Sequence, residues 1–272
     1  MNTGPSPTTD LPEDLVARCH ANTIEDYRAF ARVSAGGAIE EAPGVVIIST
    51  GDSDSMGNPA FVTHPPSDPK AVVERIRAFY DSRKLPWILI AFPESRTSVE
   101  PEAVRAGLFA EGSFPGMILH PIPSATSPEP TGFHVERVGT LERLRTLERT
   151  GCLAYGKPYA EPDPRWLEAP GVSLYLGYDG DQPVSLAALI VAHRIAGIAY
   201  VGTVPAARRR GFAEGVVRRA VADGREQGCD ASYLWATPMG RPIYARMGFR
   251  RILDYEIWSA PGTPMPAAIR PS

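Results

Sequence analysis

The sequence predicts a mixed α/β protein whose two halves repeat one order of helices and strands. Short segments of alternating or continuous apolar residues are typical of strands. The segments between them carry apolar residues at three- and four-residue steps, which are typical of amphipathic helices. A proline-rich stretch at residues 121–132 separates the halves. We therefore expect two mixed-sheet α/β domains in tandem, joined by a linker.

Composition sets the broad class. The chain has 272 residues, 43% hydrophobic and 22% charged, which is ordinary for one large or two modest soluble domains. The net charge of −3 offers no basic face to nucleic acid, and there is no apolar run of roughly eighteen residues to cross a membrane. The three cysteines lack CxxC or Cys/His spacing, so we expect a cytoplasmic protein without disulfides or a metal site.

The chain divides into four predicted parts. Residues 1–10 have neither a basic region nor an apolar stretch, so we interpret them as a disordered lead and not as a secretory signal. Residues 11–122 form the first predicted domain, 123–132 the linker, and 133–272 the second domain.

The second half has the clearer pattern. The turn Asp179-Gly180-Asp181 separates two apolar strand segments, and Gly228 follows an amphipathic helix. The expected strands are 133–138, 172–178, 184–193, 195–204, 232–236 and 254–258, and the expected helices are 141–150, 215–227 and 241–247.

The first half repeats part of this order. An amphipathic helix at 71–80 leads to a strand at 87–91, as the helix at 215–227 leads to the strand at 232–236. Residues 108–114 then precede an apolar segment at 117–119. We interpret the halves as two copies of one fold, and the alternative is a chance likeness of element order.

A basic turn opens the helix in the second half. The segment Arg208-Arg209-Arg210-Gly211-Phe212-Ala213 follows a strand and leads into that helix. The first amides of a helix have no intrahelical acceptor and carry the positive end of its dipole, so they suit a pyrophosphate. The alternative is a solvated arginine face, but positive charge at this end of a helix is unfavourable. An anion site is the better interpretation.

Two motifs in this half resemble those of one family. Arg208-x-x-Gly211-x-Ala213 resembles the R/Q-x-x-G-x-G/A signature of the GNAT superfamily of acyl-CoA N-acyltransferases. Tyr244-x-x-x-Gly248-Phe249 resembles the closing motif of the same family, in the same order and spacing. The resemblance covers about residues 133–258 and implies a GNAT fold.

The resemblance also implies where the acyl donor, acetyl-CoA by default, would bind. Its pantetheine arm would lie in a V-shaped opening between the strand segments 198–204 and 232–236, against the backbone of Gly202 and Val204. Thr237 stands where many members carry asparagine, which weakens one coenzyme contact. The pyrophosphate would be held by the amides of Arg209, Arg210, Gly211, Phe212 and Ala213.

Tyr244 is the catalytic acid that the resemblance implies, acting on the departing thiolate. The alternative is a buried tyrosine that only holds the last helix on the sheet. No carboxylate stands in the strand segment 195–204, where many members have a glutamate, so His193 is the nearest candidate base. A water relay and direct attack by a free amine remain alternatives. The acceptor pocket could be lined by Tyr155, Tyr159, Trp166, Asp254 and Glu256.

The first half lacks the coenzyme turn. Residues 64–69, His-Pro-Pro-Ser-Asp-Pro, precede its helix, and the three prolines have no N–H to donate. We expect one coenzyme site, in the second half, with the first half supporting that half or shaping the acceptor cleft.

The predicted function is an N-acetyltransferase that moves an acetyl group from acetyl-CoA to a primary amine, with a small molecule as acceptor. The alternatives are another acyl donor or acceptor, and a catalytically silent acyl-CoA-binding module. We expect no nucleic-acid or membrane partner, and a homodimer is left open.

Overall fold

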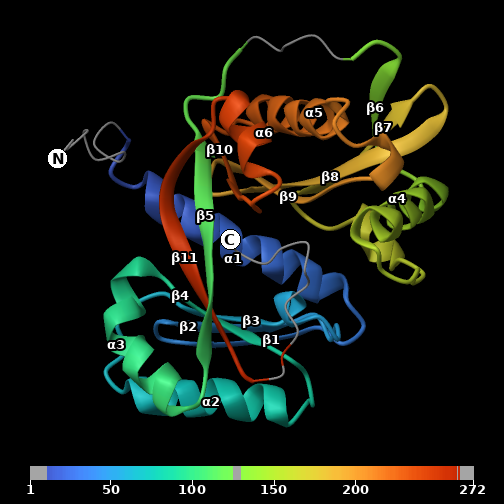
Figure 1. The fold of residues 1–272 in the computed structure, drawn as a ribbon. Coiled ribbons are helices and arrows are strands. Elements are labelled where there is room, and N and C mark those ends of the chain that lie inside the picture. Colours follow the sequence, from blue (N-terminus) through green and yellow to red (C-terminus); the bar gives the residue numbers. More distant parts are fainter. Residues whose placement is uncertain (1–10, 125–129, 262, 264–272) are drawn as a thin grey trace. The chain divides into compact units, whose positions relative to one another are not determined.

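The computed structural model describes residues 11–124, 130–261 and 263 (Figure 1). The predicted lead at 1–10 and residues 125–129 of the predicted linker lie outside the described residues. The chain forms two compact units. Unit 1 comprises residues up to 26, 117–235 and 242–252, and unit 2 comprises 27–116, 236–241 and 253 onward. The predicted boundaries of the separate domains stay a prediction.

The fold is mixed α/β, as predicted. The helices are α1 (Leu15–Val33), α2 (Pro69–Asp81), α3 (Pro93–Arg105), α4 (Leu141–Tyr155), α5 (Phe212–Glu226) and α6 (Arg241–Arg246), with short 3-10 turns at Ser55–Gly57, Pro164–Leu167 and Pro205–Ala207. The strands are β1 (Ala38–Ala42), β2 (Val45–Ser49), β3 (Pro59–Val62), β4 (Ile88–Ala91), β5 (Phe109–Leu119), β6 (Phe133–Arg137), β7 (Val172–Asp179), β8 (Gln182–Ala192), β9 (Ile195–Thr203), β10 (Ala231–Trp235) and β11 (Arg250–Ser259). No helix in the described part of the chain is long and apolar enough to cross a membrane.

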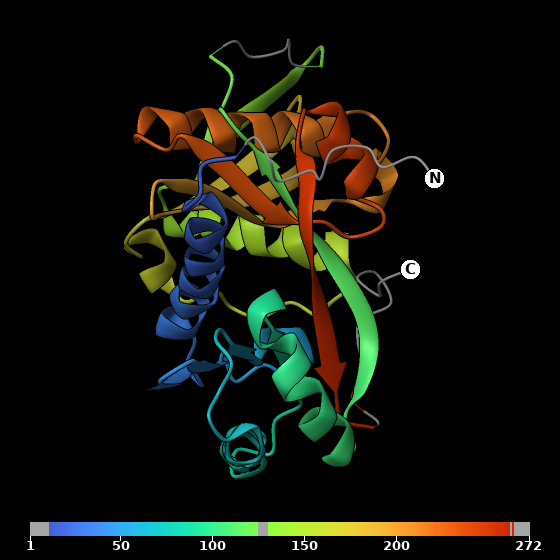
Figure 2. The same cartoon turned by 90° about the vertical axis from the view of Figure 1, so that its left-hand side faces the viewer.

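The sheet of unit 1 carries the predicted motifs. Strands β6, β7, β8 and β9 pair antiparallel in that order, and β10 then pairs parallel to β9. Helix α5 connects β9 to β10 and begins at Phe212, because Gly211 takes a left-handed conformation with φ of 87°. Figure 2 shows α5 (orange) and α4 (yellow-green) on opposite faces of these strands.

Unit 2 repeats this order of pairing. Strands β1, β2 and β3 pair antiparallel, β4 pairs parallel to β3, and α2 connects those last two strands. The C-terminal part of β11 then pairs antiparallel with β4. The shared succession of antiparallel strands, a crossover helix and a parallel strand supports the tandem interpretation, which stays a prediction.

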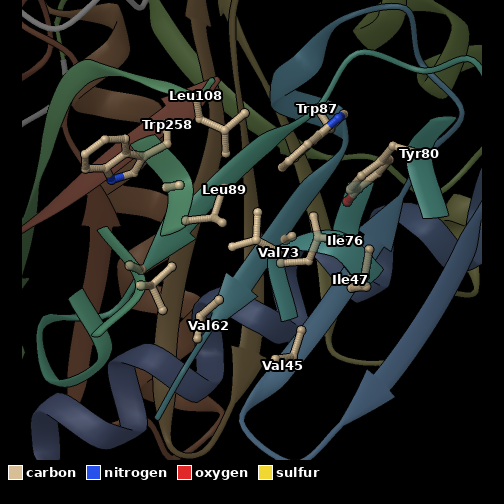
Figure 3. Close-up of a cluster of buried hydrophobic side chains, with 14 of the residues drawn as sticks. Val45, Ile47, Val62, Val73, Ile76, Tyr80, Trp87, Leu89, Leu108 and Trp258 are labelled. Carbon is tan, nitrogen blue, oxygen red and sulfur yellow. The ribbon is translucent and has the colours of Figure 1, made fainter. Parts of the chain in front are cut away.

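Each unit has its own hydrophobic core. In unit 2, α2 buries Val73, Ile76 and Tyr80 against the sheet (Figure 3). The Tyr80 ring stacks on Trp87 at 5.4 Å between centroids, and its hydroxyl donates to the carbonyl of Ile48 at 2.8 Å. In unit 1, α4 buries Leu144 and Leu147 against β7 and β8. Burial of these apolar faces is the main source of stability in each unit.

Candidate active site

The central parallel strands of unit 1 pair over only part of their length. Pairing between β9 and β10 begins at Ile195 with Ala231 and ends at Gly197 with Tyr233. Strand β9 nevertheless continues to Thr203. The strands therefore part after Gly197, and this is where an opening was expected. Beyond Gly197, the described part of β10 has no residue paired with β9.

A β-bulge marks the same part of β9. Leu186 of β8 pairs with Gly202, but Ala188 pairs with Ala199, so two residues of β9 lie opposite one of β8. The bulge includes Tyr200, whose φ is 50°. Bulges redirect side chains and often lie beside functional sites. The Tyr200 ring stacks on Tyr155 at 5.5 Å, and that contact joins β9 to the end of α4.

The predicted basic turn lies at the end of β9. A 3-10 turn at Pro205–Ala207 is followed by Arg209 with φ of 66° and by Gly211, which precedes α5 without a side-chain cap. The first hydrogen bond of the helix runs from the Gly215 amide to the Gly211 carbonyl at 3.0 Å. Among the described residues, none accepts a hydrogen bond from the amides of residues 209–213. These donors are available to an anion.

The three arginines of this turn have different surroundings. Arg208 points back into unit 1, where its guanidinium donates to the carbonyls of Thr203 at 3.2 Å and Ala154 at 2.9 Å. It therefore fixes the turn, and its guanidinium does not act at the rim. Arg210 pairs with Asp179 at 2.7 Å and lies over the Phe212 ring at 4.6 Å.

Arg209 is the charged side chain of the turn that remains available. It is exposed, and it makes no ion pair with any residue in the described ranges. Arg209 and the amides that follow it thus form the positive face of the turn.

Tyr244 lies on α6 and is 7% exposed. Burial raises the pKa of its phenol well above the usual range, so the hydroxyl is protonated at neutral pH. Tyr155 lies close enough that its pKa, raised mainly by burial, is raised further by the charge of an ionised Tyr244. The Tyr155 hydroxyl donates to the Val201 carbonyl at 2.8 Å, inside the bulge. The structure thus brings Tyr244, Tyr155 and the parted end of β9 into one part of unit 1.

Two further predicted residues have surroundings of their own. His193 occupies the tight turn between β8 and β9 with Arg194, with φ of 54° and 59°, and it is exposed at the opposite end of β9 from the basic turn. Thr237 belongs to unit 2, where its hydroxyl accepts from the Gly240 amide at 3.1 Å. The catalytic role of His193 and the coenzyme contact of Thr237 stay predictions.

The proposed acceptor-pocket residues come from both units. Glu256 and Asp254 belong to unit 2, and Glu256 pairs with Arg96 at 2.7 Å. Tyr159 is exposed and donates to Glu161 at 2.7 Å. Glu148 on α4, which no sequence motif singles out, accepts a hydrogen bond from the Tyr200 hydroxyl at 3.4 Å. No group of residues suited to hold a metal ion occurs within the described ranges.

The corresponding turn of unit 2 differs in one decisive respect. Helix α2 begins at Pro69, and the carboxylate of Asp68 accepts a hydrogen bond from the Ala71 amide at 3.0 Å. A negative side chain therefore occupies this helix N-terminus, where it would repel a phosphate.

Known proteins share this architecture. Residues 183–252, which run from β8 into β11, match the family model described as an acetyltransferase (GNAT) domain. No curated protein matches the chain.

Solved structures resemble nearly the whole chain. A GCN5-related N-acetyltransferase from Kribbella flavida is 19% identical with a TM-score of 0.67, over 90% of this chain and 96% of that one. One from Sphaerobacter thermophilus is 16% identical with a TM-score of 0.58, over 98% and 95%. A GCN5-related N-acetyltransferase-like protein from Streptococcus suis is 12% identical with a TM-score of 0.52, over 89% and 99%.

At these identities the structural likeness shows a shared fold. The family model matches the segment that contains the parted strand β9, the basic turn and Tyr244. Residues 183–252 thus match the GNAT acetyltransferase domain, and the chain as a whole shares its fold with solved GCN5-related N-acetyltransferases.

Proposed function

We propose that the protein is an N-acetyltransferase that transfers an acetyl group from acetyl-CoA to a primary amine. The observation that carries the proposal is the uncapped N-terminus of α5 directly after a strand that has parted from its neighbour. Helices α2 and α4 are capped by Asp68 and Thr140, whereas α3, which like α5 lacks a side-chain cap, begins with a proline that has no N–H to satisfy. The difference supports an external anion as the partner of the α5 amides.

The pyrophosphate of the donor would accept hydrogen bonds from the amides of residues 209–213, with Arg209 adding charge. The pantetheine arm would run along the unpaired part of β9, with the backbone of Gly202 and Val204 as hydrogen-bond partners. Packing also requires glycine at position 202, because a Cβ there would lie 2.9 Å from the Leu186 side chain and 3.0 Å from that of Ala154. The thioester would then reach the bulge, near Tyr155 and Tyr244.

Tyr244 would hydrogen-bond the sulfur as the C–S bond breaks. Its raised pKa keeps the proton on the phenol until charge develops on the sulfur. Full transfer to a thiolate whose acid has a pKa near 8.5 is uphill for such a phenol, so much of the benefit would come from stabilising the developing negative charge.

The acceptor is proposed to be a small cationic amine. The surroundings of the bulge, with the Glu148 carboxylate and several tyrosine rings, suit a protonated amine better than an anion. A catalytically silent acyl-CoA-binding module is the second candidate, because the strand segment of β9 next to the bulge carries no carboxylate.

Acyl transfer from a panel of donors separates these candidates. Acetyl-, propionyl- and succinyl-CoA would each be incubated with an arylalkylamine, a polyamine, an aminoglycoside and a short peptide. Thiol release and the product mass would be followed together. We expect amine-dependent thiol release with acetyl-CoA and an acetylated product. Binding of acetyl-CoA without transfer to any amine would instead support the silent module.

A further inference from the structure

Helix α1 carries an acid in the row of side chains that it buries. The buried members of this row follow four- and three-residue steps: Leu15, Cys19, Asn22, Ala29 and Val33. Asp26 completes the spacing between Asn22 and Ala29. Its Oδ1 is buried and has no hydrogen-bond partner within the described ranges. A buried carboxylate oxygen without a partner is costly, so stability does not account for this residue.

Helix α1 runs alongside β9 in the direction of the strand. Arg18 donates to the carbonyl of His193 at 2.9 Å, and one turn later Asn22 donates to the carbonyls of Ile190 on β8 at 3.0 Å and Ile195 on β9 at 3.2 Å. Another turn advances about 6 Å, or about two strand residues. At this pitch we infer that Asp26 lies over β8 and β9 just beyond the level of Gly197, where the pairing of β9 with β10 has ended.

Close contacts at two glycines show on which face of the unit 1 sheet α1 lies. A Cβ on Gly197 would lie 2.1 Å from Asn22 Oδ1, so Gly197 faces α1. Ala199, two residues on, points to the same face and packs against the α4 core. A Cβ on Gly224 of α5 would instead meet Ala196, on the other face. The carboxyl of Asp26 thus lies across the parted strands from α5, on the side from which an acceptor can approach a thioester held between them.

We propose that Asp26 is the general base that accepts a proton from the amine acceptor. The role rests on the proposed function. The carboxylate takes one proton from the ammonium, and the freed lone pair forms the C–N bond to the acetyl carbon. The C–S bond breaks, and its electron pair leaves on sulfur, which gains a proton assisted by Tyr244. Nitrogen loses its second proton as the amide forms, and this loss matches the proton gained by sulfur. The proton on Asp26 then passes to solvent.

The acidity of Asp26 suits this task. Burial raises its pKa from an ordinary 3.8 to about 7, and no charged group contributes to the shift. Other charged groups of unit 1 have partners of their own: Arg18 contacts Asp230, and Glu148 contacts Tyr200. A base with a pKa near the working pH combines ionisation with useful proton affinity.

The Asp26→Asn variant tests the proposal, with Asp14→Asn, at the exposed residue just before α1, as the matched control. Turnover would be measured from pH 5.5 to 9.5 with acetyl-CoA and the best amine of the panel. We expect the Asp26 variant to lose about 100-fold or more at pH 7.5 and to lack the rise in rate near pH 7. Its Kd for acetyl-CoA should stay within about twofold of wild type, because the residue contacts the acceptor.

Thermal melting supplies a readout independent of activity. The folded-state pKa of Asp26 lies above its unfolded value, so the residue destabilises the fold increasingly as pH rises through about 7. Asp26→Asn should melt at a higher temperature than wild type at pH 8, and the gain should vanish below about pH 4.

The outcomes are distinct. Wild-type turnover in Asp26→Asn would overturn the base assignment and leave the proposed function intact. A lower melting temperature at pH 8 would also overturn it, because the residue would then be structural. A wild-type protein that binds acetyl-CoA but acetylates no amine would remove both the function and this role.

Discussion

Replacing Arg209 and Arg210 by glutamate should raise the Kd of acetyl-CoA at least about 100-fold. Each charge-assisted hydrogen bond lost is worth about 1.5–3 kcal/mol, and two such losses correspond to a factor of roughly 10² to 10⁴. The substituted carboxylates would also repel the pyrophosphate. Calorimetric titration measures the change, and circular dichroism would show that the fold is kept.

The single variant Arg209→Glu sharpens this experiment, because Arg210 also pairs with Asp179. We expect about a tenfold loss from Arg209 alone. The control is Arg105→Glu with Arg225→Glu, which changes the net charge equally in the last turns of α3 and α5. Equal Kd values in the Arg209/Arg210 variant and the control would show that the α5 N-terminus does not bind the donor.

Tyr244→Phe should slow the chemical step at least tenfold while coenzyme affinity changes little. The substitution removes the hydroxyl that would stabilise the departing sulfur and keeps the ring that packs beside Phe249 at 5.9 Å. Loss of a positioned donor or acid typically costs roughly 10²-fold or more. Single-turnover measurements with saturating donor and acceptor would isolate this step.

Tyr80→Phe is the matched control for Tyr244. It deletes the same hydroxyl from a buried tyrosine of unit 2, where the lost bond to the Ile48 carbonyl costs about 1 kcal/mol of stability. Turnover should be unaffected. If Tyr244→Phe behaves in the same way, the tyrosine is only a packing residue, and proton delivery falls to water or to the attacking amine.

The strands and helices nearest the site were predictable from local pattern. The runs of apolar residues predict β8 and β9, and apolar residues at three- and four-residue steps predict α5. These patterns arise because each element buries side chains against its neighbours. Helix α4 runs five residues beyond the predicted end, to Tyr155. Gly151 interrupts the apolar pattern there, although it belongs to the helix. Glycine is needed at this position because a Cβ would lie 2.1 Å from the Tyr200 hydroxyl.

Other features depend on contacts that no local pattern contains. Residues 108–114 were expected to precede a strand, but β5 runs unbroken from Phe109 to Leu119. Helix α3 begins at Pro93 and includes Pro101, so its sequence lacks the signature of an amphipathic helix. The burial of Asp26 and the inward turn of Arg208 toward Ala154 follow from distant segments meeting in the folded unit. The motif residues were visible in the sequence, but their partners were not.

Calorimetric titration of the wild-type chain with acetyl-CoA tests the central claim most directly, because the α5 N-terminus is uncapped and the α2 N-terminus is occupied by Asp68. We predict one site per chain, abolished by the Arg209/Arg210 substitutions. Two equivalent sites, or binding that survives those substitutions, would contradict the account.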